Sequence, residues 1–331
     1  MVGGALKISS IFEMNKLIIA FIIGFTFLNL NAQSSDESRS DNITTFKNYL
    51  VFKTNISTQN ESFSVFDGEE KYSIEALNAF KLQLAANYRF LGLSLSFSPL
   101  DKSSDFKSKF IETKIRFFIK KWIQSIEYRR VQGFYLENVS TDAIDQQFPH
   151  LKTTSYIGET SYVFNDDFSL KHLTDQNEWQ HESAGSFIPA IRYGYNRISD
   201  YVFENKFVQN NYDIKLAPSY YYTWCLKNNW FIAPNVTPSI GLRFSKERFL
   251  DLEESDTFVT KGLNLGIQYG YTSERISTGA VFNFEANSIN KSSNRNLEID
   301  RNYVNLYFTY RFDAPRFLED AVDGIYRKLG L

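Results

Sequence analysis

The segment Lys261–Tyr271 separates into two faces when every second residue is read. One face is wholly apolar and the other is small and polar: Leu263, Leu265, Ile267, Tyr269 and Tyr271 against Gly262, Asn264, Gly266, Gln268 and Gly270. Because a β-strand points alternate side chains to opposite sides, this segment predicts a strand with one apolar and one polar face.

The same alternation returns in segments such as 91–97 and 304–312. Runs of about ten residues with alternating hydrophobicity, separated by turn residues, are typical of outer-membrane β-barrels. The aromatic fraction of 17%, with 31 Phe and 20 Tyr, suits the lipid-facing band and aromatic girdles of such a barrel. We therefore predict an all-β fold, an integral outer-membrane antiparallel β-barrel. The alternative is a secreted, soluble β protein.

The pattern predicts about 12 strands, within a range of 10–14. The predicted strands cover residues 46–56, 80–88, 91–97, 109–119, 122–135, 153–164, 187–195, 212–226, 230–244, 262–271, 276–286 and 301–312. An even number places both ends of the barrel in the periplasm, with short turns on that side and long loops outside. The strand count is least certain around 165–197, because the polar segment 168–182 fits either a further strand pair or a long insertion. Gln124 and Arg130 interrupt an otherwise apolar outer face.

The front of the chain resembles a secretory signal peptide. A basic start precedes the apolar run 17–28, which is too short for a membrane span, and Ala32 offers a small residue for cleavage. We expect residues 1–32 to be a cleaved signal peptide whose true start is Met14, followed by a flexible lead-in over 33–45. The expected location is the cell outer membrane.

After the barrel, predicted over 46–312, the tail 313–331 changes period. Asp313 and Pro315 suit a helix start, and apolar residues then recur at helical spacing from Phe317 onward. We predict a short C-terminal amphipathic helix on the periplasmic membrane surface or against the barrel mouth. A periplasmic partner for this tail is the alternative.

Three segments carry a family resemblance: Asn87–Pro99, Ser183–Phe187 and Tyr310–Leu318. Together they resemble the domain of unknown function 4421 family, over about residues 45–318. The resemblance implies an exported outer-membrane barrel of a Gram-negative bacterium and brings no established activity with it.

The alternation also predicts which charged side chains face the lumen. They are Lys81, Arg89, Glu112, Lys114, Arg116, Glu127, Arg129, Glu159, Arg192, Asp213, Lys215, Arg243, Glu285 and Arg311. Charges within a low-dielectric wall must pair or be hydrated. They therefore indicate either an ionic network that fills the barrel or a pore or cavity with a mild cationic bias, since nine of the fourteen are basic.

One motif suggests catalysis. His181 and Ser183 are two apart, so on a strand they share a face and the imidazole could accept the hydroxyl proton. This spacing resembles the His-x-Ser pair of outer-membrane phospholipases, with Asn196 as a conceivable third member. The pair departs from that pattern at Ala184 and Gly185, where Asn-Gly is expected.

The sequence carries no strong metal or cofactor motif. The three histidines show no ligand spacing, and Cys225 stands alone, which excludes an intrachain disulfide and a cysteine metal cage. The acidic run Asp251, Glu253, Glu254 and Asp256 is either a solvated loop or a site that binds calcium or bridges to lipopolysaccharide. We expect no metal and no cofactor, and the net charge of −2 gives no reason to expect nucleic acid.

These features favour a non-enzymatic, porin-like barrel: a small-solute channel or a structural component of the envelope. The alternative from another class is a phospholipase-like lipid hydrolase. The expected partners are outer-membrane lipid, lipopolysaccharide and the barrel-assembly machinery.

Overall fold

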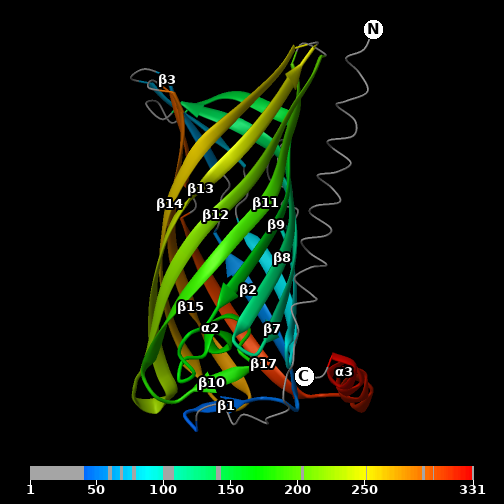
Figure 1. Cartoon of the computed structure of the whole chain (residues 1–331), viewed down its shortest axis with the longest axis vertical. Coiled ribbons are helices and arrows are strands. Elements are labelled where there is room, and N and C mark those ends of the chain that lie inside the picture. Colours follow the sequence, from blue (N-terminus) through cyan, green and yellow to red (C-terminus); the bar gives the residue numbers. More distant parts are fainter. Residues whose placement is uncertain are drawn as a thin grey trace. The chain divides into compact units, whose positions relative to one another are not determined.

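The alternating segments form one continuous antiparallel sheet in the computed structural model (Figure 1). The structure describes residues 41–58, 62–67, 70–76, 80–99, 108–138, 143–202, 205–250, 252–292, 295–300 and 302–329. The expected signal peptide, residues 1–32 with Met14, lies outside these residues.

Within the described part of the chain, twelve strands make a closed ring. In ring order they are β2 (Tyr49–Ser57), β5 (Lys81–Tyr88), β6 (Leu91–Phe97), β7 (Lys109–Ile119), β8 (Trp122–Asn138), β9 (Ala143–Tyr162), β11 (Ala184–Val202), β12 (Asn205–Cys225), β13 (Trp230–Phe249), β14 (Leu252–Thr272), β15 (Ile276–Ser292) and β17 (Tyr303–Asp313). The last strand, β17, pairs with the first, β2, which closes the barrel. The predicted twelve-stranded antiparallel barrel is therefore confirmed.

One end of the barrel carries tight turns, and we call it the short-turn end. Arg89 (φ 50°), Lys120 (φ 53°) and Asn228 (φ 58°) take left-handed backbone conformations at three of these turns, at the last within the 3-10 turn η1 (Lys227–Asn229). Such conformations allow the chain to reverse within two or three residues. A fourth turn joins β14 to β15 at residues 273–275.

The opposite end, called the extended end, is built from much longer strands. β13 has 20 residues and β14 has 21, whereas about 9–11 residues suffice to cross a membrane. The short strands β3 (Ser62–Asp67), β4 (Glu70–Glu75) and β16 (Arg295–Asp300) fill the wall at this end, where β3 pairs with β16 and β4 with β8. The predicted long loops are thus partly strand extensions.

The two faces of the wall differ as the alternation predicts. Leu263, Leu265 and Ile267 are large apolar residues and are 39–45% exposed on the outer surface. Thr260 and Gln268, which have the opposite parity on the same strand, are buried. A soluble monomer rarely exposes so wide an apolar surface, so the outer wall matches the lipid-facing band of a membrane barrel.

Residues 163–183, between β9 and β11, are a long insertion rather than a further barrel hairpin. They contain α2 (Leu170–Thr174) and β10 (Glu178–Gln180), which pairs with β1 (Ile43–Thr45) in a separate two-stranded sheet. Of the two readings that the sequence left open for 168–182, the insertion is the one observed. Residues 43–45, expected in the lead-in, form β1.

The C-terminal segment is helical, as predicted: α3 spans Arg316–Leu329 and belongs to a separate compact unit from the barrel. Among the described residues, no helix has the length and apolar character needed to cross a membrane.

Candidate functional site: the barrel lumen and its plug

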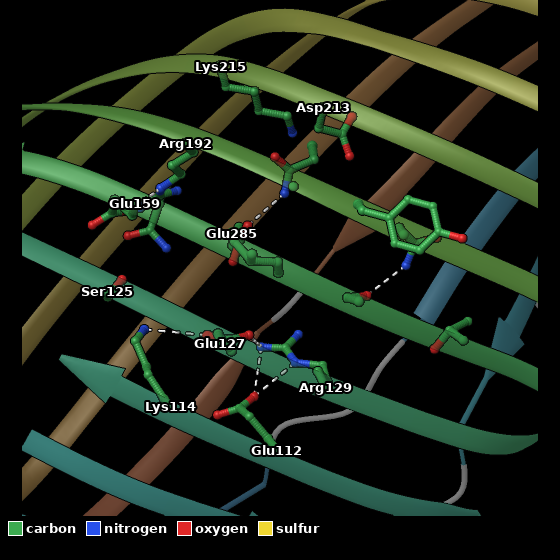
Figure 2. A pocket seen from close by; sticks show the side chains of 18 of the residues that line it. Glu112, Lys114, Ser125, Glu127, Arg129, Glu159, Arg192, Asp213, Lys215 and Glu285 are labelled. Carbon is green, nitrogen blue, oxygen red and sulfur yellow. Dashed lines mark hydrogen bonds and ion pairs between the residues drawn. The ribbon is translucent and has the colours of Figure 1, made fainter. Parts of the chain in front are cut away.

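A polar cavity of about 530 Å³ lies in the lumen and is lined by side chains from most strands of the ring (Figure 2). Eleven of the fourteen charged residues expected in the lumen line it: Lys81, Glu112, Lys114, Glu127, Arg129, Glu159, Arg192, Asp213, Lys215, Arg243 and Glu285. Six of these are basic and five acidic, so the described lining is nearly balanced in charge.

On one wall, the charges of β7 and β8 form a continuous network. Arg129 Nη2 lies 2.9 Å from Glu112 Oε2 and 2.8 Å from Glu127 Oε1, and Lys114 Nζ lies 3.4 Å from Glu127 Oε2. Figure 2 shows these four side chains converging from the two strands. Each buried charge therefore has a partner of opposite sign, which offsets its desolvation.

Neighbouring strands of the ring carry further ion pairs. Arg243 binds Asp213 with two donors, Nε at 2.7 Å and Nη2 at 2.8 Å, in the fork geometry that suits a carboxylate. Arg192 Nε donates to Glu159, and Glu285 accepts a hydrogen bond from Asn287 Nδ2 at 2.8 Å. Paired in this way, the charges fix the shape of the wall.

The lining also contains nine amide side chains, none of which was predicted as part of a lumen site: Asn55, Gln83, Asn196, Gln209, Asn211, Asn264, Asn283, Asn287 and Asn305. Their inward parity on the strands would have identified them. Buried amide oxygens of Asn55, Asn211 and Asn305 have no hydrogen-bond partner within the described residues. Because most charges in the lining are paired, the oxygens of these three amides are the groups that can accept further hydrogen bonds in the cavity.

The remaining three of the fourteen residues do not line this cavity; Arg116, Arg311 and Arg89 contact the insertion at the short-turn end. Arg116 forms an ion pair with Asp175, whose side chain is 3% exposed. Arg311 is fully buried and donates to the Gln176 carbonyl at 2.9 Å. Arg89 lies in the β5–β6 turn, where its carbonyl accepts from Asn177 Nδ2 at 2.8 Å.

Polar contacts hold the insertion to strands around the ring. From β2, Lys53 Nζ donates to the Thr174 carbonyl at 2.9 Å, and from β5, Asn87 Nδ2 donates to the Asp175 carbonyl at 2.8 Å. From β15, the Ser277 hydroxyl donates to Gln176 Oε1 at 2.6 Å. On the far side, Cys225 of β12 lies against the Gln180 carbonyl at 3.3 Å. Because these contacts come from opposite sides of the ring, the insertion lies across the lumen, and we call residues 163–183 the plug.

An apolar cluster completes the plug. Phe168 and Leu173 of the plug are buried against inward residues of four strands: Phe118 (β7), Ile123 (β8), Ile188 (β11), and Phe231 and Ala233 (β13). Inward-facing apolar residues at this level distinguish the short-turn end from the polar cavity. The cluster thus seals the plug against the wall by the hydrophobic effect.

Two plug residues, Asp175 and His172, pack closely against the barrel wall. A side chain at Gly92 would bring a Cβ within 2.7 Å of Asp175 Oδ2, so glycine is what allows the plug carboxylate to approach β6. His172 is 1% exposed and its ring contacts that of Phe231 at 4.4 Å. Burial, together with the positive charge of Arg311, lowers the pKa of His172 to about 3. The imidazole is therefore neutral at physiological pH.

The three residues of the hydrolase hypothesis are not brought together. His181 Nε2 lies 2.7 Å from Thr44 Oγ1, whereas the Ser183 hydroxyl accepts a hydrogen bond from the Cys225 amide at 2.9 Å. Asn196 lies far along β11 and donates to Ser155. At ~3.3 Å per residue, the thirteen positions between Ser183 and Asn196 correspond to roughly 40 Å of extended strand.

No group of three or more His, Cys, Asp or Glu residues that could hold a metal is found among the described residues. In the acidic run, Asp251 lies outside the described residues. Glu253 is paired with Lys246 at 2.8 Å and Arg248 at 3.0 Å, and these two partners lower the pKa of its carboxyl.

A closed antiparallel ring with an apolar outer wall and a polar lumen defines the class of outer-membrane β-barrel folds. Within this class the chain belongs to the family described as Domain of unknown function (DUF4421), whose model matches residues 39–312. The expected family resemblance is therefore confirmed. No curated protein matches the sequence.

Solved structures with a similar fold include several outer-membrane proteins. The outer membrane protease OmpT from Escherichia coli shares 5% identity, with 81% of this chain and 98% of that chain covered and a TM-score of 0.43. An outer membrane channel from Pseudomonas putida F1 shares 10% identity, with 83% and 99% covered and a TM-score of 0.39. LpxR from Salmonella typhimurium shares 9% identity, with 79% and 100% covered and a TM-score of 0.33.

Proposed function

We propose that this protein is a non-enzymatic outer-membrane barrel that acts as a plugged small-solute channel. The observation that carries the proposal is the plug: residues 163–183 lie across the lumen at the short-turn end, with a polar cavity on the other side. A solute would enter from the extended end, occupy the cavity, and pass only when the plug moves.

The outer wall supports placement in the outer membrane. Aromatic residues that meet lipid at the short-turn end include Trp122 beside Tyr162 and Trp230 stacked on Tyr269, with ring centroids 4.9 Å and 5.0 Å apart. Such aromatic girdles anchor a barrel at the membrane interface. The short turns then face the periplasm, together with the plug, as in other barrels of this class.

The cavity favours a small polar solute that is uncharged or zwitterionic. Six basic and five acidic side chains line it, and most are in ion pairs. The lining therefore offers little unpaired charge to attract a solute with a large net charge. The unpartnered oxygens of Asn55, Asn211 and Asn305 accept hydrogen bonds. Hydroxyl or ammonium groups of the solute would supply the donors.

Planar-bilayer recording tests this proposal. The wild-type protein is expected to give rare, brief openings. A variant in which residues 166–181 are replaced by a short Gly-Asn-Gly turn is expected to give a steady conductance, because the tie between β9 and β11 remains and the lumen is cleared. A folded deletion variant that conducts no more than wild type would contradict the channel and leave a structural barrel. A large steady conductance of the wild type would contradict the plug.

A further inference from the structure

A row of aromatic side chains crosses five strands on the outer wall, toward the extended end. Cross-strand pairing aligns Tyr128 (β8), Tyr156 (β9), Tyr195 (β11), Tyr212 (β12) and Phe244 (β13). Neighbouring rings among the four tyrosines lie 5.2, 6.4 and 5.2 Å apart between centroids. Because barrel strands are tilted, the row runs obliquely around the wall and borders the apolar outer surface on these strands.

The outer surface changes character directly beyond this row. The next outward residues on the same five strands are Arg130, Thr154, Arg197, Asn210 and Lys246, which are again aligned by pairing. The row after it brings in Lys152 and Arg248, and Lys206 follows on β12. We call Arg130, Lys152, Arg197, Lys206, Lys246 and Arg248 the outer basic patch.

Part of this patch surrounds a groove of about 470 Å³. The groove is lined by four cations, two amides and two aliphatic side chains: Arg197, Lys206, Lys246, Arg248, Asn205, Asn210, Val208 and Leu250. The cations therefore converge on a hollow with apolar contacts inside it, rather than spreading over a flat surface.

The positive charge of the patch is only partly neutralised. Lys246 and Arg248 share the single carboxylate of Glu253. Within the described residues, no carboxylate lies within salt-bridge distance of Lys152, Arg197 or Lys206. Lys152 also lies within electrostatic range of Arg130, Arg197 and Lys206, all of the same charge as itself. The mutual repulsion of these cations is unfavourable, and a bound anion would offset it.

We propose that the outer basic patch binds the phosphate-bearing headgroup of an anionic lipid in the outer leaflet. Guanidinium groups match phosphate oxygens with two parallel hydrogen bonds, and lysines add point charge. The aromatic side chains that border the patch are of the type that lies between acyl chains and headgroups. The inference rests on the membrane placement proposed above and is independent of the plug.

A lipid titration followed by native mass spectrometry of the full chain in non-ionic detergent tests this proposal. The probe is bis-phosphorylated lipid A, compared with the same lipid after removal of both phosphates and with inorganic phosphate. The patch variant carries Arg197→Gln, Lys246→Gln and Arg248→Gln. A matched control removes three exposed lysines from the short-turn end, with Lys47→Gln, Lys120→Gln and Lys227→Gln.

Wild type and the control variant are expected to bind the phosphorylated lipid equally. The patch variant is expected to bind it at least about tenfold more weakly, since each basic residue near an anionic headgroup contributes appreciably. The dephosphorylated lipid should bind wild type as weakly as the patch variant binds the intact lipid, and inorganic phosphate should not displace the lipid. Equal binding by the patch variant, or equal binding of both lipid forms, would overturn the proposal. If the protein is soluble without detergent, the membrane placement fails as well.

Discussion

Removal of the Arg116 side chain isolates the contribution of one buried ion pair to plug closure. Asp175, on the plug, is 3% exposed and Arg116, on β7, is 22% exposed. Loss of one partner of a buried pair costs ~3–5 kcal/mol, because the other charge stays desolvated. Lys53 interacts electrostatically with Asp175 and would compensate in part, so the lower limit of about 3 kcal/mol is expected for Arg116→Ala. At ~1.4 kcal/mol per factor of ten, the open fraction rises about a hundredfold.

The assay is the open probability in planar bilayers. Lys121→Ala is the matched control, because Lys121 also pairs with the plug, through Asp166, but the two side chains are 37% and 63% exposed. Such an exposed pair contributes less than ~1 kcal/mol, so the control should stay near wild type. Adding Asp175→Asn to Arg116→Ala removes the orphaned charge and should restore much of the closure. If folded Arg116→Ala opens no more often than Lys121→Ala, the plug is not held by this pair.

Three further predictions concern the plug and its surroundings. His172 has a folded-state pKa of about 3, below its ordinary value of 6.5. Protonation therefore favours the unfolded plug, so the folding free energy is unaffected above pH 6.5 and declines as the pH falls toward 3. At pH 4.5 the loss of folding free energy is about 2–3 kcal/mol. Cleavage within 163–183 by proteinase K, normalised at each pH to its cleavage of an unfolded substrate, should be faster at pH 4.5 than at pH 7.5, and His172→Leu should flatten that dependence. Gly92→Val should loosen the plug by ~1–3 kcal/mol, because its Cβ would meet Asp175 at 2.7 Å; unchanged protease resistance would refute this fit. Wild type and Ser183→Ala should both fail to hydrolyse phospholipid in detergent micelles, and hydrolysis that Ser183→Ala abolishes would revive the enzyme hypothesis.

The barrel was predictable because its physical cause is local and periodic. Each strand must meet lipid on one side and water or polar groups on the other, so parity in segments such as 262–271 identifies both faces without any knowledge of the fold. Short turns at 89–90 and 227–229 fix the pairing of neighbouring strands. At the extended end the outward residues are polar too, so alternation there is weak and does not predict the strand extensions.

The position of the plug could not be predicted from the sequence. Its helix α2 has five residues, too few to show a helical period, and its buried residues include His172, Gln176 and Glu178, which are usually exposed. These residues are buried because the barrel surrounds them, which is a long-range effect. The alternation predicts Arg311 on the inner face, but its contact with Gln176 depends on the plug.

The two interruptions of the apolar face of β8 have different physical explanations. Gln124 faces outward, where its amide donates to Tyr193 Oη at 2.9 Å and accepts from Thr160 Oγ1 at 2.6 Å, so its polar atoms are satisfied at the surface of the barrel. Arg130 lies one outward position beyond Tyr128 and belongs to the outer basic patch. The interruptions therefore mark a satisfied amide and a member of the outer basic patch, and they leave the register of β8 unchanged.

A plugged channel of this kind requires a barrel that crosses the outer membrane with its short turns in the periplasm. Single cysteines at Asn228, in the short turn η1, and at Leu250, between β13 and β14, test this directly in a Cys225→Ser background. In intact cells a membrane-impermeant maleimide is predicted to label Leu250→Cys at once and Asn228→Cys only after the envelope is opened. Labelling of Asn228→Cys in intact cells, with Leu250→Cys protected, would contradict the orientation, and equal labelling of both would contradict the membrane placement.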